Sequence, residues 1–178
     1  MIVRVAVPSP IGELAVFARG DHVVALDLTG TSVPSGRYLE RRFGAEPQRG
    51  ADDALDLRRR LDAYFAGDLR ALDPIAVDTA GTPFQRAVWA ALRRIPPGTT
   101  WSYADVARAV GAPAAVRAVG AANGANPVAI VIPCHRVVRT GGALGGYGGG
   151  LERKRWLLAH ERAALPAGAL VQRTLFTG

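Results

Sequence analysis

The strongest constraint on the fold is a change of pattern near Gly81, which divides the chain into two unlike segments. Before it, alternating or continuous apolar runs (IVRVAV, ELAVFA, HVVALDL) are broken by prolines and glycines, a pattern typical of strands joined by tight turns. After it, apolar residues recur at helical spacing between Pro and Gly breaks. The sequence therefore predicts an α+β protein, with a small α/β domain over 1–78 and a mostly helical domain over 79–178.

The first segment contains no pattern that points to chemistry. His22 has no cysteine nearby, so a structural residue is expected there rather than a zinc ligand. The expected elements are strands over 2–7, 13–28 and the start of 72–81, helices over 37–44 and 54–67, and loops over 30–36 and 45–52.

Charge is divided at the same place as the strand and helix patterns. The chain of 178 residues carries a net charge of +7. Residues 1–78 hold 10 Arg against 12 Asp or Glu, a balance of −2, whereas residues 79–178 hold 11 Arg and one Lys against three acidic residues, a balance of +9. This asymmetry favours a polyanionic partner for the second segment, with nucleic acid as the first choice. An arginine-rich genome is the competing explanation, but it would not remove acidic residues from one segment only.

The second segment contains a candidate helix-turn-helix. A helix is expected to begin with Thr82 as its cap and Pro83 at its first position, and to end at the Pro-Pro-Gly run. Ser102 then caps a short helix that ends at Val110, and a second short helix is expected over 114–122. Two short helices joined by a glycine-containing turn fit a helix-turn-helix, although an ordinary helical hairpin fits the same spacing.

The only cysteine, Cys134, stands in the stretch IPCHRVV, directly after a short buried strand expected at 129–132. A free thiol has a pKa of about 8.5, so a nucleophilic cysteine needs a base or a positive field close by. His135 and Arg136 are candidates for these roles, and Pro133 makes an irregular backbone plausible. A buried and chemically inert thiol is the alternative.

His135 can serve as a base for the thiol only under two conditions. Adjacent side chains on a regular strand point to opposite faces, so His135 reaches Cys134 only at a bend or through a water molecule. A histidine base also needs an orienting partner, and Glu152 and Glu161 are the glutamates of this segment.

The stretch RTGGALGGYGGG at 139–150 contains seven glycines and one tyrosine. Such a stretch is either a flexible linker or a loop whose backbone approaches a ligand closely. A helix is expected over 151–161 directly after it. Neither the GxxxxGK[ST] pattern of a phosphate-binding loop nor a CxxC pair occurs, so no cofactor and no metal is expected.

The residues around Cys134 resemble a known family. NPVAIVIPCHRVV at 126–138 resembles the active-site signature of the O6-alkylguanine-DNA alkyltransferases, and TPFQRAVWAALRRIPPGTTWSYADVARAVG and GGYGGGLERKRWLLAHE resemble its flanking segments. The resemblance is specific over about residues 80–162 and looser over 1–79, where GELAV and LDAYFAGD still fit. It implies an RNase H-like first domain, a helix-turn-helix followed by an active-site cysteine turn, and direct-reversal DNA repair used once per molecule.

The resemblance also implies roles for five residues. Cys134 is expected to accept the alkyl group from guanine O6 in DNA, with thymine O4 as a further substrate that the sequence cannot rank. His135 is expected to act as base through a bridging water, and Glu161 to orient His135. Tyr103 is expected to help rotate the nucleotide out of the duplex and to donate a proton toward the leaving guanine. Asn126 is expected to link the helix-turn-helix to the active-site turn.

DNA contacts follow from the same resemblance. Arg117, in the second short helix, aligns with the arginine that enters the duplex and fills the place of the extruded nucleotide. Ser102, Ala118, Asn123 and Arg136 are expected to contact DNA beside it. Such contacts offset the cost of unstacking a base, which is a few kcal/mol.

The base pocket is expected to form around the glycine-rich loop. Besides Tyr103, the substrate-binding residues expected there are Leu144, Tyr147, Gly148, Gly149 and Lys154. Some family members carry a serine where this chain has Gly148, so a side-chain hydroxyl contact is lost, whereas a backbone contact can survive. The zinc ligands of some relatives and a second cysteine-bearing acceptor domain are missing, which favours a stand-alone repair protein.

Duplex DNA carrying an alkylated base is the expected partner, the protein is expected to be a monomer, and clustering on DNA is left open. No apolar run approaches the roughly 18 residues needed to span a bilayer, and MIVRVAVPSP lacks the features of a signal peptide, so the cytoplasm is expected. Three other classes compete: a non-catalytic DNA-binding relative, a helix-turn-helix regulator with an incidental cysteine, and a cysteine hydrolase.

Overall fold

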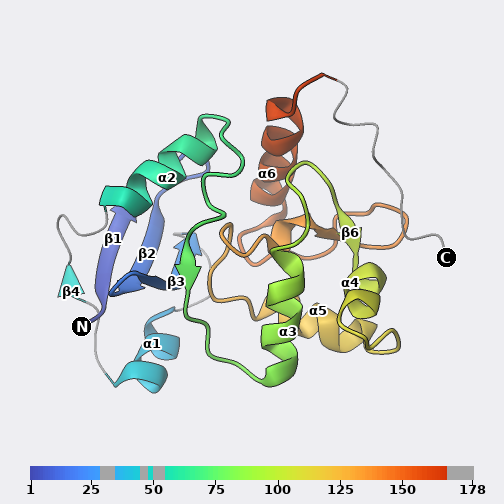
Figure 1. Ribbon diagram of the computed structural model, residues 1–178, viewed down its shortest axis with the longest axis horizontal. Helices are drawn as coiled ribbons and strands as arrows, with labels where there is room; N and C mark the ends of the chain where they lie inside the picture. The colour runs from blue at the N-terminus through green and yellow to red at the C-terminus, as the bar shows by residue number, and fades with distance from the viewer. Residues whose placement is uncertain (29–34, 45–47, 50–54, 168–178) are drawn as a thin grey trace.

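The computed structural model describes residues 1–28, 35–44, 48–49 and 55–167, and its first segment is built on one mixed sheet (Figure 1). The five strands lie in the order β4-β1-β2-β3-β5, with antiparallel pairing in the centre and parallel pairing at both edges. The strands are β1 (Val3–Val7), β2 (Leu14–Arg19), β3 (His22–Leu28), β4 (Gln48–Arg49) and β5 (Ala76–Val77).

The strands expected over 2–7 and 13–28 are confirmed, and the second run is divided into β2 and β3 by a tight turn at Gly20, whose φ is 59°. Within 72–81 the structure forms only the two-residue strand β5, which begins at Ala76 rather than at the start of the run. The loop expected over 45–52 contains β4, and the rest of it, together with 30–34, lies outside the described residues. The C-terminal tail from 168 onward also lies outside them.

Both faces of the sheet are covered because apolar residues occupy both sets of alternating positions. Helix α1 (Ser35–Phe43) packs Leu39 against one face, beside Phe17 and Val24. Helix α2 (Leu55–Phe65) packs Leu61 and Tyr64 against the other face. The face covered by α2 also packs against the second segment, so the two segments join on this side of the sheet.

The second segment is mostly helical, as expected, and its caps follow the sequence. Thr82 and Ser102 each form a capping box, with Gln85 and Asp105 respectively. The second short helix begins at Val116, two residues later than expected. The elements are α3 (Pro83–Leu92), β6 (Trp101–Ser102), α4 (Tyr103–Ala109), α5 (Val116–Gly124), the 3₁₀ turn η1 (Cys134–Arg136), β7 (Val137–Val138) and α6 (Leu151–Ala164).

The strand expected at 129–132 is absent, and the residues form a buried turn instead. Ile130 has a φ of 72°, in the left-handed region, and only isolated bridges occur, between Leu26 and Val128 and between Ala129 and Ile132. The turn is held by Asn126, whose Nδ2 donates to the Ile132 carbonyl at 2.8 Å while its Oδ1 accepts from the Val128 amide at 3.0 Å. The apolar run AIVI is therefore buried by the turn rather than by a sheet.

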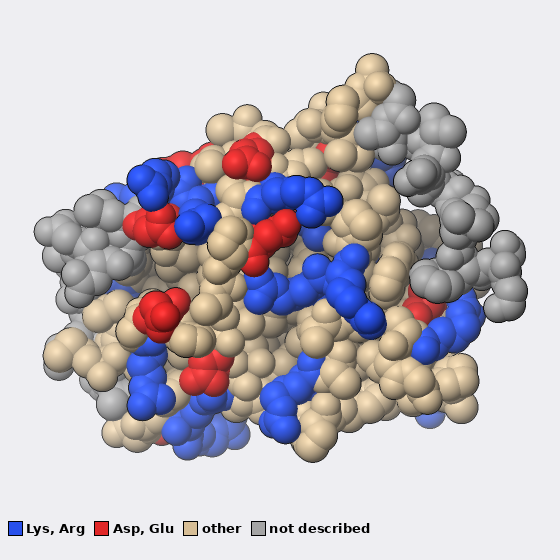
Figure 2. All heavy atoms as spheres, in the orientation of Figure 1, with Lys and Arg blue, Asp and Glu red and all other residues tan. Residues whose placement is uncertain are grey.

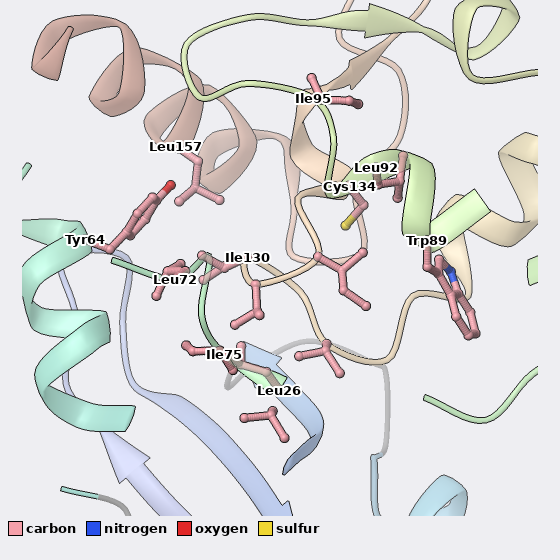
Figure 3. Packing of buried hydrophobic residues seen from close by; sticks show 14 of the residues in the cluster. Leu26, Tyr64, Leu72, Ile75, Trp89, Leu92, Ile95, Ile130, Cys134 and Leu157 are labelled. Carbon is pink, nitrogen blue, oxygen red and sulfur yellow. The ribbon is translucent and has the colours of Figure 1, made fainter. Parts of the chain in front are cut away.

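One hydrophobic core joins the two segments (Figure 3). Leu26, Tyr64 and Ile75 from the first segment belong to the same buried cluster as Ile130 and Leu157 from the second. A domain boundary near residue 78 stays a prediction, because the described core continues across it. None of the described helices is long and apolar enough to cross a bilayer.

Candidate active site

Cys134 lies at the start of the 3₁₀ turn η1, in the wall of a cavity of about 400 Å³. A volume of this size falls within the roughly 300–1,000 Å³ typical of small-molecule sites. The cavity walls come from β3, α4, α5, the turn after α5 and the glycine-rich loop, so both segments contribute. The side chain of Cys134 is only 6% exposed and belongs to the core cluster in Figure 3.

The carboxylate of Glu161, on α6, is fully buried and receives four hydrogen-bonding groups. His135 Nε2 lies 2.7 Å from its Oε1, the Tyr64 hydroxyl donates to the same oxygen at 2.8 Å, and the Gly98 amide donates to Oε2 at 3.1 Å. Arg136 binds both oxygens, with NH2 at 2.9 Å from Oε1 and Nε at 3.0 Å from Oε2. Burial alone would raise the pKa of Glu161, but His135 and Arg136 outweigh it and lower the pKa. Glu161 is therefore ionised.

His135 is a neutral base in this arrangement. Burial lowers its pKa, and this effect outweighs the opposing attraction of Glu161. Since Glu161 is ionised, the ring hydrogen of neutral His135 lies on Nε2 and donates to the carboxylate. Nδ1 then carries the lone pair, and it has no hydrogen-bonding partner among the described residues. The ring can accept a proton at Nδ1.

The thiol of Cys134 needs such a base. Burial raises its pKa, against the opposing effects of a hydrogen bond from Asn126 and the positive charge of Lys154. The thiol is therefore protonated at neutral pH. Cys134 and His135 occupy a 3₁₀ turn rather than a strand. The backbone therefore has the bend that lets the His135 side chain approach the thiol.

Tyr103, at the start of α4, lines the cavity with its half-buried ring. Burial and the neighbouring Cys134 raise the pKa of its hydroxyl, so the hydroxyl keeps its proton. Gly145 stands close to this hydroxyl with a φ of 69°, and a Cβ there would lie 3.0 Å from the Tyr103 oxygen. The loop can approach Tyr103 this closely because position 145 is glycine.

Family models match both segments of the chain. The model for the ribonuclease-like domain of 6-O-methylguanine DNA methyltransferase matches residues 2–79, and the model for its DNA binding domain matches residues 83–163. A methylated-DNA–protein-cysteine methyltransferase of Mycolicibacterium paratuberculosis is 49% identical over 168 residues, which cover 94% of this chain and 96% of that protein. The chain belongs to the 6-O-methylguanine DNA methyltransferase family. The resemblance read from the residues around Cys134 is thereby confirmed.

Solved structures of the same family share the fold. The crystal structure of Mycobacterium tuberculosis O6-methylguanine methyltransferase matches with a TM-score of 0.78 and 41% identity, and covers 94% of this chain and 96% of that chain. The structure of the Mycobacterium tuberculosis protein in complex with DNA matches with a TM-score of 0.75 and 41% identity, over 91% and 94% of the two chains. The predicted α+β class is confirmed.

The structure of this family member brings the five expected catalytic residues to one place. Cys134, Tyr103 and Asn126 line the cavity, and His135 and Glu161 form the hydrogen-bonded pair beside it. Among the described residues, no three His, Cys, Asp or Glu side chains are grouped so as to hold a metal ion.

Arg136 does not lie on a DNA-facing surface, which corrects the expected DNA contact. Its side chain is only 8% exposed, forms the paired hydrogen bonds with Glu161, and donates from NH1 to the Ile95 carbonyl at 2.7 Å. The physical reason is that the buried carboxylate needs a cation, and Arg136 supplies it.

Lys154 and Leu144 do not line the cavity, although both were expected to bind substrate. Lys154 is fully buried, and its Nζ donates to the carbonyls of Val137 at 2.7 Å, Gly146 at 3.3 Å, and Leu144. Burial lowers the pKa of Lys154 to about 8. The lysine holds the glycine-rich loop in place through these hydrogen bonds. It therefore affects the shape of the cavity without lining it.

Asn123 lies in the cavity wall rather than on an outer surface, so a contact with the outside of the duplex is not supported and a contact with DNA stays a prediction. The residue is only 6% exposed and lines the same cavity as Cys134. Tyr147, Gly148 and Gly149 line this cavity too, as the expected substrate-binding role requires.

The residues of α4 and α5 that were expected to bind DNA differ in whether their side chains are free to contact it. Arg117 and Ala118 are exposed on α5, whereas the hydroxyl of Ser102 is engaged with Asp105 in the capping box. In Figure 2, most acidic side chains of the visible face lie on the side of the first segment, interspersed with Lys and Arg, whereas Lys and Arg outnumber them among the charged side chains on the side of the second segment.

Tyr64 and Gly98 were not identified from the sequence. Tyr64 lies in the helix expected over 54–67, and Gly98 is the last residue of the Pro-Pro-Gly run; neither pattern points to a site. Tyr64 and Glu161 are 97 residues apart, and no local pattern marks a contact across that distance.

Proposed function

We propose that this protein repairs DNA by direct reversal, by transferring an alkyl group from guanine O6 to the sulfur of Cys134, once per molecule. The observation that supports the proposal best is the buried Cys134–His135–Glu161 arrangement. His135 is neutral there, bonded to an ionised carboxylate through Nε2, and open at Nδ1. The relative from Mycolicibacterium paratuberculosis, which is 49% identical, is a methylated-DNA–protein-cysteine methyltransferase.

The transfer balances without a cofactor. His135 removes the thiol proton of Cys134 through a water molecule, and Glu161 holds the ring in the tautomer that can accept it. The sulfur electron pair attacks the carbon bound to O6, so an S–C bond forms while the C–O6 bond breaks. The pair of the broken bond returns to guanine, which takes one proton. The net result is a thioether on the protein and an unmodified guanine in DNA.

Tyr103 is the proposed proton donor to the leaving guanine. Its hydroxyl lines the cavity that holds Cys134, and its raised pKa keeps it protonated until the base accepts the proton. Because the thiol proton resides on His135 after the attack, its return to Tyr103 restores the charge balance of the site.

The base must leave the duplex before Cys134 can reach it. Arg117, exposed on α5, is the proposed side chain that fills the vacated position, and Ala118 next to it leaves room for the DNA backbone. Ser102 marks the start of α4, which packs against α5. The proposal extends to a monomer that works in the cytoplasm and to thymine O4 as a second substrate.

The other classes fit the site less well. A non-catalytic DNA-binding relative has no use for a base beside a cysteine, and a regulator has no use for the cavity around it. A cysteine hydrolase releases its covalent intermediate, whereas the thioether formed here is stable.

The deciding measurement is the intact mass of the protein after incubation with a duplex that contains one O6-methylguanine. We expect the mass to rise by one methyl group, mapped to Cys134, and to stay unchanged with undamaged DNA. Cys134→Ser should lose the transfer and keep binding to the damaged duplex. A folded wild-type protein that gains no mass would refute the proposed reaction.

A further inference from the structure

Three buried side-chain atoms in the described part of the chain lack a hydrogen-bonding partner, and all three belong to the surroundings of Cys134. They are His135 Nδ1, Asn123 Oδ1 and the Tyr147 hydroxyl. A buried polar group without a partner costs roughly 1–3 kcal/mol, and folded proteins contain few of them. The proposed mechanism uses His135 Nδ1 and gives no role to the other two atoms.

Asn123 is a polar residue whose amide oxygen has no hydrogen-bonding partner in the described part of the chain. It lies in the last turn of α5 with 6% of its surface exposed, and it lines the cavity together with Cys134. The rest of the wall combines the polar residues Asp27, Tyr103 and Asn126 with aliphatic residues and glycines: Leu26, Leu28, Gly120, Gly124, Pro127, Ala129. A leucine of similar volume would fit such a wall without leaving an unpaired oxygen, so the amide points to a ligand group that binds it.

Tyr147 supplies a second such polar group to the same wall. Its ring lies against Gly149, where a Cβ would stand 2.7 Å from the ring, and both residues line the cavity. An amide and a phenol each donate and accept hydrogen bonds. Together they can bind a hydroxyl group both as a hydrogen-bond donor and as a hydrogen-bond acceptor.

A substituent on O6 that is longer than methyl can reach these atoms, because Asn123 and Tyr147 line the same cavity as Cys134. The sulfur of Cys134 attacks the first carbon in line with O6, so the rest of the substituent extends sideways from that line, toward the cavity wall. A methyl group ends at the reacting carbon. A two-carbon chain with a terminal hydroxyl extends further by one carbon and one oxygen.

We propose that Asn123, assisted by the Tyr147 hydroxyl, selects O6 substituents that carry a hydrogen-bonding group at their end over apolar substituents of the same length. The inference rests on the proposed function and assigns to its substrate site a preference for hydroxyalkyl lesions. Asn123 is then a specificity residue that touches the substituent, and it takes no part in the proton transfers.

The test compares two duplexes that differ in one terminal group: O6-(2-hydroxyethyl)guanine ends in a hydroxyl, and O6-propylguanine ends in a methyl of nearly the same size. For each protein, the single-turnover rate of transfer to Cys134 from the hydroxyethyl duplex is divided by the rate from the propyl duplex. Changes in folding or in general DNA affinity affect both rates and cancel in this ratio. We expect the wild-type protein to favour the hydroxyethyl duplex. Asn123→Leu should lower the ratio about tenfold, because the hydroxyl then meets an apolar side chain at this position.

Two further variants separate the possible outcomes. Tyr147→Phe should lower the ratio in the same direction, and Ala121→Leu, which adds a leucine at an exposed position of α5, should leave it unchanged. An equal ratio in wild type, Asn123→Leu and Tyr147→Phe would overturn the inference and leave the proposed reaction intact. A wild-type protein that accepts neither group nor a methyl would instead refute the proposed function itself.

Discussion

At the scale of the residue, Glu161 organises the site. Its buried carboxylate is bonded to Tyr64, Gly98, His135 and Arg136, which come from three places along the chain. A buried charge without such partners would cost several kcal/mol. Each partner therefore stabilises the carboxylate, and the carboxylate in turn holds the ring of His135.

Glu161→Gln should lower the free energy of unfolding at pH 7 by about 3–5 kcal/mol, because it leaves Arg136 buried without its counter-charge. The pKa of Glu161 is lower in the folded protein than its ordinary 4.5, so the unfolded chain binds more protons in acid. The stabilisation is therefore complete above pH 4.5 and is lost as the pH falls below it.

Urea unfolding followed by circular dichroism between pH 3.5 and pH 7 measures both effects. The difference between wild type and Glu161→Gln should shrink below pH 4.5. Glu152→Gln, an exposed change on the same helix, serves as the control with a small effect. A constant difference across the whole pH range would contradict the assignment of the acid sensitivity to Glu161.

At the scale of the element, the first turn of α6 fixes the glycine-rich loop. Lys154 donates to three carbonyls of the loop and the strand before it, and Arg153 donates to the Gly149 carbonyl at 3.3 Å and to the Ile11 carbonyl at 2.9 Å. A loop with seven glycines has a high conformational entropy when free. The two cations reduce that freedom and give the cavity wall a defined shape.

Lys154→Met should loosen the loop, since a thioether cannot replace the three hydrogen bonds of the ammonium group. A hydrogen bond to a charged group contributes roughly 1.5–3 kcal/mol, so amide exchange over 143–149 should become about ten to a hundred times faster. Hydrogen exchange read by mass spectrometry gives this rate directly. Arg155→Met changes the exposed neighbour on the same helix and should have no such effect; identical exchange in both variants would exclude the proposed role of Lys154.

At the scale of the whole molecule, the two segments share one core and are expected to unfold together. Leu61 and Tyr64 on α2 pack in the same cluster as Leu157 on α6. Tyr64 also reaches across to Glu161, and His160 Nε2 lies 2.8 Å from the Tyr64 carbonyl. The active site therefore depends on the first segment, although none of the expected catalytic residues lies there.

Leu61→Ala tests this dependence because Leu61 is fully buried in the first segment. We expect a loss of about 2–5 kcal/mol in the free energy of unfolding. All three tryptophans lie in the second segment, so their fluorescence reports that segment and, through Trp156 beside Phe65, its contact with α2, whereas circular dichroism reports the whole chain. Both signals should move to the same lower urea concentration. An unchanged fluorescence midpoint would show that the segments unfold independently, and Arg59→Ala, exposed on the same helix, is the control.

The sequence by itself determined whatever depends on neighbours a few residues away. The capping boxes at Thr82 and Ser102, the strands before Gly81, the helices after it and the signature around Cys134 all follow from short patterns. The physical reason is that helical and strand periodicity, capping and proline geometry act within one or two turns of chain.

Only the tertiary structure decided which side chains share a desolvated space. Arg136 turns inward because Glu161 is buried beside it, and the run at 129–132 becomes a turn because Asn126 bridges its two ends. Asn123 lines the cavity, and Tyr64 meets a carboxylate 97 residues away. These contacts depend on how distant segments pack, because the energy of a buried charge or amide is set by all the groups around it, whatever their distance along the chain.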